Sequence, residues 1–310
     1  MTANQKTRVD THRRYQYSAI SDRPVYEWPQ GKRLALHLSL NIEHFRFGAG
    51  LGNDYAVSQP HPNIRSFGWR DYGNRVGAMR LLDLADAYGF KYGLLVNSDV
   101  YAYCPGLIER FSEKGHEIVG HGRTDSERQI DMSEEEEIAC IAEVTETLRS
   151  HEGVSPKGWL APYICQTSRS LELLKENGYE YMMDWPIDDQ PIWFTTKHGR
   201  ILSIPYSHDL NDSIECVSRR TPSQMFCDNL IDQFDEMLEE SRTRPLVMSI
   251  VLHSFVLGQP YRLRQFRKVM DHIAQHRGEI WMATPGQIAD HVKSLPPGIV
   301  PGDGSEPSQA

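Results

Sequence analysis

Two histidines, an arginine and an aspartate lie close together in the stretch "GHEIVGHGRTDSER", residues 115–128. Imidazole and carboxylate groups at this spacing can bind a divalent metal ion or transfer protons. They can equally form a polar turn after a strand, because His121 can pair with a backbone carbonyl and Asp125 can cap a helix or turn. His116 precedes the strand core and is expected on the surface. Which of these three roles applies depends on the other polar side chains that lie near this stretch in the fold.

Short apolar runs alternate with helical patterns through most of the chain. The predicted strands are residues 33–42, 91–96, 116–120, 157–161, 180–185, 200–206, 245–253 and 279–283. The predicted helices are residues 75–89, 105–114, 134–150, 168–177, 222–241, 262–276 and 285–293. Alternation of this kind implies parallel strands joined by helical crossovers, and about seven such units predict a closed or nearly closed α/β barrel.

Acids and histidines follow several of these strands directly. Sites in parallel α/β folds form at the carboxyl ends of the strands, so these side chains are expected to meet. In chain order they are Asn41, Glu43 and His44; His121, Arg123 and Asp125; Pro162 and Tyr163; Asp184, Trp185, Asp188 and Asp189; His208, Asp209 and Asp212; and His253.

The chemistry that suits this set is hydrolysis of an amide-like bond. The reaction needs an activated water, donors for the developing oxyanion and an acid for the leaving nitrogen. Glu43, His121 and Asp125 offer oxygen, nitrogen and oxygen to a divalent ion. His253 follows the apolar run "LVMSIVL", where a polar group needs a partner, and its imidazole is the expected acid.

The segment of residues 44–74 is long, aromatic, Gly-rich and aperiodic, so it predicts a functional loop. Trp69 in this loop, Trp185, Asp189 and Arg123 are candidate substrate-binding residues. The tryptophans can also belong to the core, and Asp189 lies between prolines in a possible turn.

Composition excludes several classes of function. The 310 residues carry a formal net charge of −9, with no basic surplus for nucleic acid. The five cysteines contain no CxxC pair, and no G-x-G-x-x-G or P-loop pattern follows a strand. The absence of those patterns predicts neither a nucleotide nor a redox cofactor. The polar N-terminus and the lack of a long apolar run predict a cytoplasmic protein with no membrane contact.

The expected domain organisation has three parts. Residues 1–30 form an irregular N-terminal arm, residues 31–293 the barrel, and the Pro/Gly/Ser-rich residues 294–310 a flexible tail.

Five motifs together resemble the polysaccharide deacetylase superfamily, the NodB-homology or carbohydrate esterase family 4 fold, over about residues 30–293. They are "LNIEHF", "GHEIVGHGRTDS", "WLAPY", "DWPIDD" and "VLHS". The resemblance implies a distorted (β/α) barrel of the NodB-homology type with about seven parallel strands. It also implies a catalytic base on the first strand, a metal site that includes His121, and His253 as the general acid.

The chain departs from the family pattern at charged positions. Asn41 aligns with the base and Glu43 with the metal-binding aspartate, and a one-residue shift leaves open which of Asn41, Glu43 or His44 occupies the base position. Asp125 stands in place of the second metal histidine, and Leu160 in place of the arginine of the third motif. These departures resemble a sub-branch of allantoinases and cyclic imide hydrolases, which has segments similar to "IPYSHDLND" and "LHSFVLGQPYR".

The sub-branch implies a hydrolase of non-peptide C–N bonds that opens a small cyclic amide (a ureide, hydantoin or imide) or cleaves a linear amide. Glu43, alone or through a zinc or manganese ion held with His121 and Asp125, would activate water, and the backbone N–H of Tyr163 would stabilise the oxyanion. Two alternatives remain: a metal-dependent carbohydrate or peptidoglycan N-deacetylase, and a catalytically degenerate binding protein.

The expected partner is a small-molecule substrate, and the resemblance implies a homo-oligomer. The aromatic arm suits subunit packing, because exposed tyrosines and tryptophan otherwise lack a partner.

Overall fold

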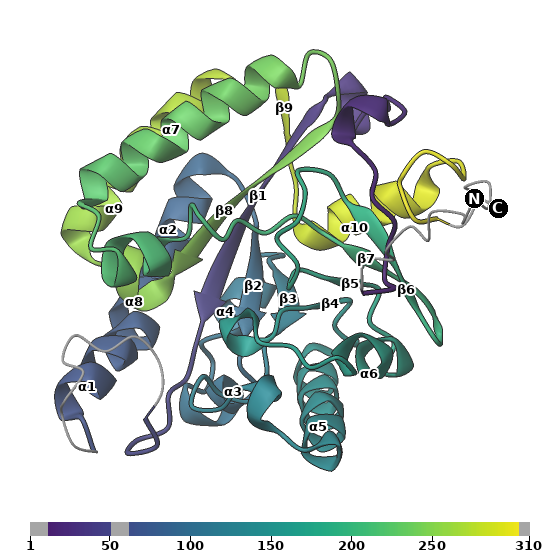
Figure 1. Cartoon of the computed structure of the whole chain (residues 1–310). Coiled ribbons are helices and arrows are strands. Elements are labelled where there is room, and N and C mark those ends of the chain that lie inside the picture. The colour runs from purple at the N-terminus through teal and green to yellow at the C-terminus, as the bar shows by residue number, and fades with distance from the viewer. Residues whose placement is uncertain (1–11, 51–61, 304–310) are drawn as a thin grey trace, which may run out of the picture.

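The computed structural model describes residues 12–50 and 62–303 of the chain, which form an α/β fold (Figure 1). The strands are β1 Leu34–Ile42, β2 Tyr92–Val96, β3 Glu117–Gly120, β4 Gly158–Trp159, β5 Tyr181–Met182, β6 Ile192–Thr196, β7 Gly199–Ser203, β8 Leu246–His253 and β9 Ile280–Met282. The α-helices are α1 Ile64–Tyr72, α2 Ala78–Tyr88, α3 Asp99–Tyr103, α4 Glu109–Ser112, α5 Glu134–Glu152, α6 Ser170–Glu176, α7 Ser223–Glu240, α8 Ser254–Leu257, α9 Pro260–Gln275 and α10 Pro285–Ser294. None of the helices in the described ranges is long and apolar enough to cross a membrane.

The strands form one curled, mostly parallel sheet in the order β6-β7-β5-β4-β3-β2-β1-β8, with β9 also paired with β1. Strand β1 is central: β8 pairs along its length, β9 pairs with residues 34–36, and β2 pairs with residues 38–42. The prediction of a distorted NodB-type barrel is confirmed.

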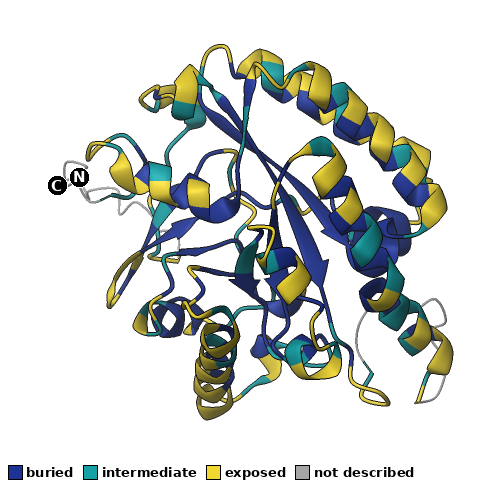
Figure 2. Ribbon diagram, turned by 180° about the vertical axis from the view of Figure 1, so that it is seen from behind, coloured by how far each residue is buried: buried dark blue, intermediate teal, exposed yellow. Residues whose placement is uncertain are grey.

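The alternation along β1 explains the two faces of this sheet. Even-numbered residues from Leu34 to Ile42 are apolar and join the core under α2, α7 and α9. Odd-numbered residues line the inside of the barrel, and the Nε2 of His37 lies 2.9 Å from the carbonyl oxygen of Pro205. Figure 2 shows buried strands behind helices whose outer faces are exposed. The polar interior positions of β1 lead toward Asn41 at the end of the strand.

Several elements differ from the sequence predictions, which did not include the short helices α3 and α8. Strand β6 was not predicted, because prolines before it obscured the pattern, and it pairs antiparallel to β7. The predicted loop 44–74 instead contains α1, whose N-cap Asn63 accepts a hydrogen bond from the Ser66 N–H, followed by a π-helical turn at residues 73–77. Residues 51–61 of that loop lie outside the described part.

The arm packs against its own chain. Trp28 is 1% exposed, and its Nε1 donates to the Leu246 carbonyl at 3.0 Å. Tyr26 is also buried, whereas Tyr17 is exposed. The expectation that the tryptophan of the arm needs a partner subunit is therefore corrected.

The segment after α10 also packs closely. Val300 is buried, and the Trp193 N–H donates to the Pro301 carbonyl at 2.9 Å. Residues 295–303, expected within a flexible tail, thus pack on the barrel. The division of the chain into arm, barrel and tail as separate units stays a prediction.

The arm is expected to contribute strongly to stability. Trp28→Ala should lower the free energy of unfolding by about 3–5 kcal/mol, because it leaves a cavity and an unpaired carbonyl. Urea denaturation followed by circular dichroism measures this loss. Tyr17→Ala is the matched aromatic control and should change stability by less than about 0.5 kcal/mol. Equal effects of the two variants would mean that the arm packs loosely in solution.

Candidate active site

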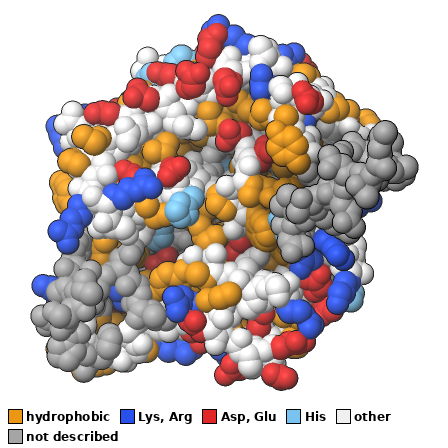
Figure 3. Space-filling view, in the orientation of Figure 1, with side chains coloured by type: hydrophobic (Ala, Val, Ile, Leu, Met, Phe, Trp, Pro, Cys, Tyr) orange, Lys and Arg blue, Asp and Glu red, His pale blue; other side chains and the backbone are white. Residues whose placement is uncertain are grey.

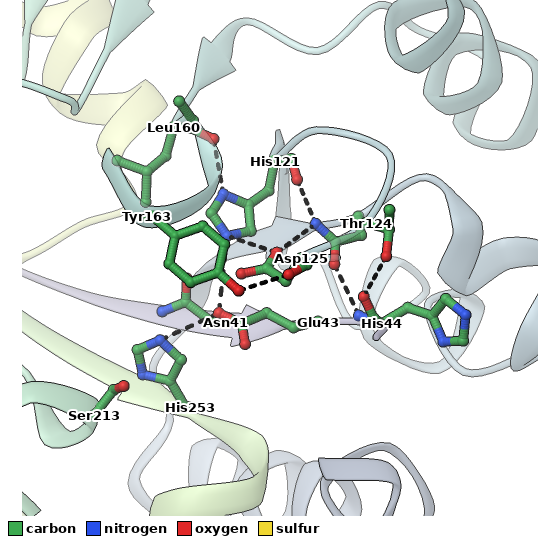
Figure 4. A network of polar contacts seen from close by, with 12 residues as sticks. Asn41, Glu43, His44, His121, Thr124, Asp125, Leu160, Tyr163, Ser213 and His253 are labelled. Atoms are coloured by element: carbon green, nitrogen blue, oxygen red, sulfur yellow. Dashed lines mark hydrogen bonds and ion pairs between the residues drawn. The ribbon is translucent and has the colours of Figure 1, made fainter. Parts of the chain in front are cut away.

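The register of the sheet brings four strand ends to one level. Asn41 of β1 pairs with His253 of β8, so Glu43, which follows the end of β1, lies near His253. The His121 N–H donates to the carbonyl of Val96 at 3.2 Å, which places the end of β3 beside the end of β2. Figure 4 shows the resulting convergence of carboxylates and imidazoles from different strands.

A buried carboxylate lies at the centre of this group. One oxygen of Glu43, Oε1, is 3.2 Å from His253 Nε2 and 3.9 Å from His121 Nε2. His121 Nε2 is also 3.6 Å from Asp125 Oδ1. All four residues are buried. Charges removed from water in this way need partners, and here the partners alternate in sign.

Asp212 holds His253 from the side opposite Glu43. Its Oδ1 is 2.7 Å from His253 Nδ1, and its Oδ2 accepts the backbone N–H of His253 at 2.9 Å. Both contacts fix the imidazole ring with Nε2 toward Glu43. This is the arrangement by which a carboxylate orients an imidazole for proton transfer.

The loop after β4 orients His121. His121 Nδ1 lies 2.7 Å from the Leu160 carbonyl, an oxygen that can only accept, so Nδ1 carries a proton. Nε2 therefore faces Glu43 and Asp125. Burial alone would lower the pKa of His121, but the charge of Asp125 and the contacts with Glu43 raise it. Asp184 anchors the loop, because its Oδ1 accepts the Ala161 N–H at 2.7 Å.

Tyr163 covers the group from the same loop. Its backbone has φ of 61°, and the next residue, Ile164, has φ of 56°. Non-glycine residues in this left-handed region are strained and concentrate at functional sites. The Tyr163 hydroxyl donates to the Asp125 carbonyl at 2.5 Å, which ties the two loops together.

Asn97 organises Asp125 from below. Its Nδ2 donates to Asp125 Oδ1 at 2.9 Å and to the carbonyl of His121, while its Oδ1 accepts the His44 N–H at 2.8 Å. One buried amide therefore connects the loops that follow β1, β2 and β3.

The electrostatics of the site follow from these contacts. Burial alone would raise the pKa of Glu43, but the positive charge of His253 and the hydrogen bonds of both imidazoles lower it. Burial alone would lower the pKa of His253, but the charges of Glu43 and then Asp212 raise it to about 10. Burial, reinforced by Glu43, raises the pKa of Asp125 to about 7. At neutral pH, His253 therefore holds a proton while Glu43 is ionised.

Glu43, His121 and Asp125 also meet the requirements of a divalent-metal site. Their ligand atoms all lie within 4.8 Å of one another. The carbonyl behind His121 and the amide behind Asp125 are the kind of outer contacts that orient metal ligands. A Glu/His/Asp set leaves open positions for water and substrate, so the residues present fit such an ion.

A cavity of about 180 Å³ opens above these residues. Its floor includes Asn41, Glu43, His121 and His253, and Phe255 is one of its apolar walls. Figure 3 shows histidine and acidic side chains at the bottom of a hollow bordered by hydrophobic side chains.

Comparison with known proteins agrees with this architecture. Residues 70–182 match the family model described as polysaccharide deacetylase. A crystal structure of PuuE allantoinase superposes with a TM-score of 0.81 at 25% identity, covering 91% of this chain and 99% of that one. A probable polysaccharide deacetylase from Pseudomonas aeruginosa PAO1 gives a TM-score of 0.79 at 27% identity, covering 87% and 94%. The peptidoglycan deacetylase of Helicobacter pylori is 25% identical, covering 71% of this chain and 84% of its own.

Residues 70–182 carry a polysaccharide deacetylase domain, and the fold of the described residues matches solved structures of a probable polysaccharide deacetylase and an allantoinase. The protein is accordingly a hydrolase that acts on carbon–nitrogen bonds other than peptide bonds. The reading of a catalytically degenerate binding protein is not favoured by this result.

Two positions that are charged in the superfamily are neutral here. Asn41, at the expected base position, donates to the Leu252 carbonyl at 2.9 Å and to the Tyr206 hydroxyl at 3.2 Å. Leu160, in place of the motif arginine, lines the same cavity. An amide whose donors are engaged has no proton-accepting role, so Glu43 is the carboxylate available there. His44 points away and packs on the ring of Tyr103 at 4.3 Å.

Four residues predicted to bind substrate lie outside the lining of this cavity, because their side chains have other partners. Arg123 pairs outward with Glu127 and Glu143. Trp185 packs on Phe194 and donates to Gln166. Asp189 lines a separate cavity. Trp69 packs edge-on against Phe255, one layer behind the cavity wall, at a ring distance of 4.8 Å.

Other neighbours of the site were missed as site residues. Asp212 was seen only as one acid among several at a strand end, and Asn97 and Tyr206 were not singled out. The useful signals were an asparagine directly after the apolar run "YGLLV" and the polar pair "ND" after β7. The functional roles of the residues that do converge stay predictions. His116, expected on the surface, is buried and accepts the Tyr92 N–H at 2.8 Å.

Asp184 should make stability depend on pH. Burial raises its pKa to about 7, although the Ala161 N–H and the charge of His121 oppose the rise. A carboxyl with a raised pKa favours the folded state most below its unfolded pKa of about 3.9, and this contribution is lost as pH rises to 7. In urea titrations, the free energy of unfolding of the wild-type protein should therefore fall by on the order of 3 kcal/mol between pH 4 and pH 8 because of Asp184. The Asp184→Asn variant should not show this part of the fall.

Asp83→Asn, at an exposed position, is the control and should keep the wild-type pH profile. An Asp184→Asn profile parallel to that of the wild type would contradict the raised pKa.

Proposed function

We propose that this chain hydrolyses a carbon–nitrogen bond of a small cyclic amide, such as a ureide, hydantoin or imide, or of a linear amide of similar size. The observation that carries the proposal is the buried Asp212–His253–Glu43 chain at the floor of a cavity of about 180 Å³. A cavity of this size suits a small ring rather than a polymer strand. The similarity to the PuuE allantoinase structure supports the same choice.

His253 acts as the general acid in this mechanism. Asp212 and Glu43 keep it protonated, so it gives up its proton only to a strong base, such as the nitrogen expelled when the amide bond breaks. Nε2 is the donating atom, because Nδ1 is held by Asp212.

Glu43 acts as the proton acceptor for the attacking water. Its carboxylate remains ionised at neutral pH and lies 3.2 Å from the acid. The backbone N–H of Tyr163, which has no hydrogen-bond partner among the described residues, is the proposed donor to the oxyanion. Phe45 and Phe255 exclude water from the apolar side of the cavity.

Glu43, His121 and Asp125 would hold a divalent ion, zinc or manganese. When bound, such an ion lowers the pKa of water and polarises a carbonyl. This group favours the second candidate function, a metal-dependent N-deacetylase of carbohydrate or peptidoglycan, which the Helicobacter pylori relative also supports.

A cytoplasmic location and a homo-oligomer remain part of the proposal. The exposed side chains of Tyr17 and Val25 in the arm are available for subunit contact.

A substrate panel tests the proposed function. Purified protein is assayed on cyclic imides, hydantoins, allantoin and N-acetylglucosamine oligomers, before and after chelation, with metal content measured by elemental analysis. The expected result is ring opening of at least one cyclic amide. Hydrolysis of N-acetyl sugars alone would overturn the proposal in favour of deacetylation. Loss of both metal and activity in Asp125→Ala would assign that residue to the metal site.

Asp212 should control the proton on His253. Asp212→Asn removes a charge that raises the pKa of His253, so the fall in kcat/KM at alkaline pH should move to lower pH. We also expect kcat to drop by roughly 100-fold or more, because a misoriented acid protonates the leaving group poorly. Asp209→Asn, three residues away and exposed, is the matched control. An unchanged alkaline limb in Asp212→Asn would exclude this role.

A further inference from the structure

A second group of side chains able to bind a metal ion lies on the outer helices α7 and α9. Asp235 of α7 and His272 of α9 join His276, which directly follows α9, and the ligand atoms of the three lie within 4.8 Å of one another. In Figure 1 the chain leaves α9 toward β9 at the end of the barrel opposite the carboxyl ends of β1 and β8. The group is therefore separate from the active site.

Helix geometry sets the two imidazoles on one face. His272 and His276 are four residues apart, the spacing that places side chains one turn above each other. Both rings pack against Phe234 of α7, at centroid distances of 5.8 and 5.7 Å. Phe234 is fully buried, so it provides a rigid apolar floor that limits the rotation of both rings.

Carboxylates face both imidazoles. Asp235 Oδ1 lies 2.7 Å from His272 Nε2, and Glu279 Oε1 lies 2.8 Å from His276 Nδ1. Among the ion pairs of the described residues, no lysine or arginine pairs with Asp235 or Glu279. A divalent ion can take the place of the proton in such a carboxylate–imidazole contact, and the proton is then released to solvent.

We propose that Asp235, His272 and His276 form a second site, for a divalent transition-metal ion such as Zn²⁺, that links α7 to α9. Two imidazoles and one carboxylate select ions of this class over Mg²⁺ or Ca²⁺, which prefer oxygen ligands alone. In a tetrahedral zinc site the ligand atoms lie about 3.3 Å apart, so small side-chain rotations close the group around the ion. Glu279 lies outside this group, and its contact with His276 Nδ1 would orient that imidazole.

The ion would act on stability rather than on chemistry. It binds residues of two helices that cover the β1–β8 side of the sheet, and a ligand that binds only the folded state stabilises it. Excess Zn²⁺ should raise Tm by about 3 °C or more in the full-length protein.

Zinc titration by calorimetry and native mass spectrometry tests the site. The His121→Ala background removes a ligand of the catalytic group, so that binding there does not mask the second site. His121→Ala should bind one Zn²⁺ tightly, and the double variant with His276→Ala should lose that binding or weaken it by at least roughly 10-fold. The double variant with His198→Ala is the matched control, because His198 also contacts a carboxylate, that of Glu176, at 2.7 Å. It should bind like His121→Ala.

Equal zinc binding by His121→Ala and its His276→Ala double variant would overturn the proposal. If His121→Ala does not fold, the wild-type protein and the single His276→Ala variant are compared. A difference of one bound ion, with loss of the Zn²⁺-induced rise in Tm, supports the site, and equal stoichiometry overturns it.

Discussion

The carboxylate of Glu43 is buried, and its negative charge must be compensated inside the protein. Two imidazoles provide the compensation, and each is held by a further carboxylate, Asp212 behind His253 and Asp125 beside His121. The result is a buried chain of alternating acid and base. Its groups shift one another's pKa values in opposite directions, which leaves a proton on His253 and a charge on Glu43 at the pH of the cell.

The curled parallel sheet makes such a chain possible. The members come from four places in the chain: Glu43 after β1, His121 and Asp125 after β3, Asp212 after β7, and His253 at the end of β8. No single segment therefore has to place two like charges together. The register sets Asn41 opposite His253, and the Val96 carbonyl sets the height of His121. Backbone contacts then fix the directions of the rings. A helical pair or a single loop could not hold so many ionisable groups at this depth with their partners satisfied.

The neutral residues of the cavity are as informative as the charged ones. The resemblance to the deacetylase motifs predicts a base at Asn41 and an arginine at Leu160, and both of these neutral residues line the same cavity. The charges at the floor of the cavity are those of Glu43 and its neighbours, close to the apolar wall of Phe255.

The sequence alone determined the fold class and most of the strand ends, because apolar alternation and helix caps are local properties. It also placed Glu43, His121, Asp125 and His253 at those ends. Only the tertiary structure decided which polar residues meet. Arg123 turns outward because Glu127 and Glu143 lie nearby, whereas Asp212 turns inward because the register of β8 brings His253 to it. Side-chain direction and pairing across distant strands depend on contacts that have no signature in local sequence.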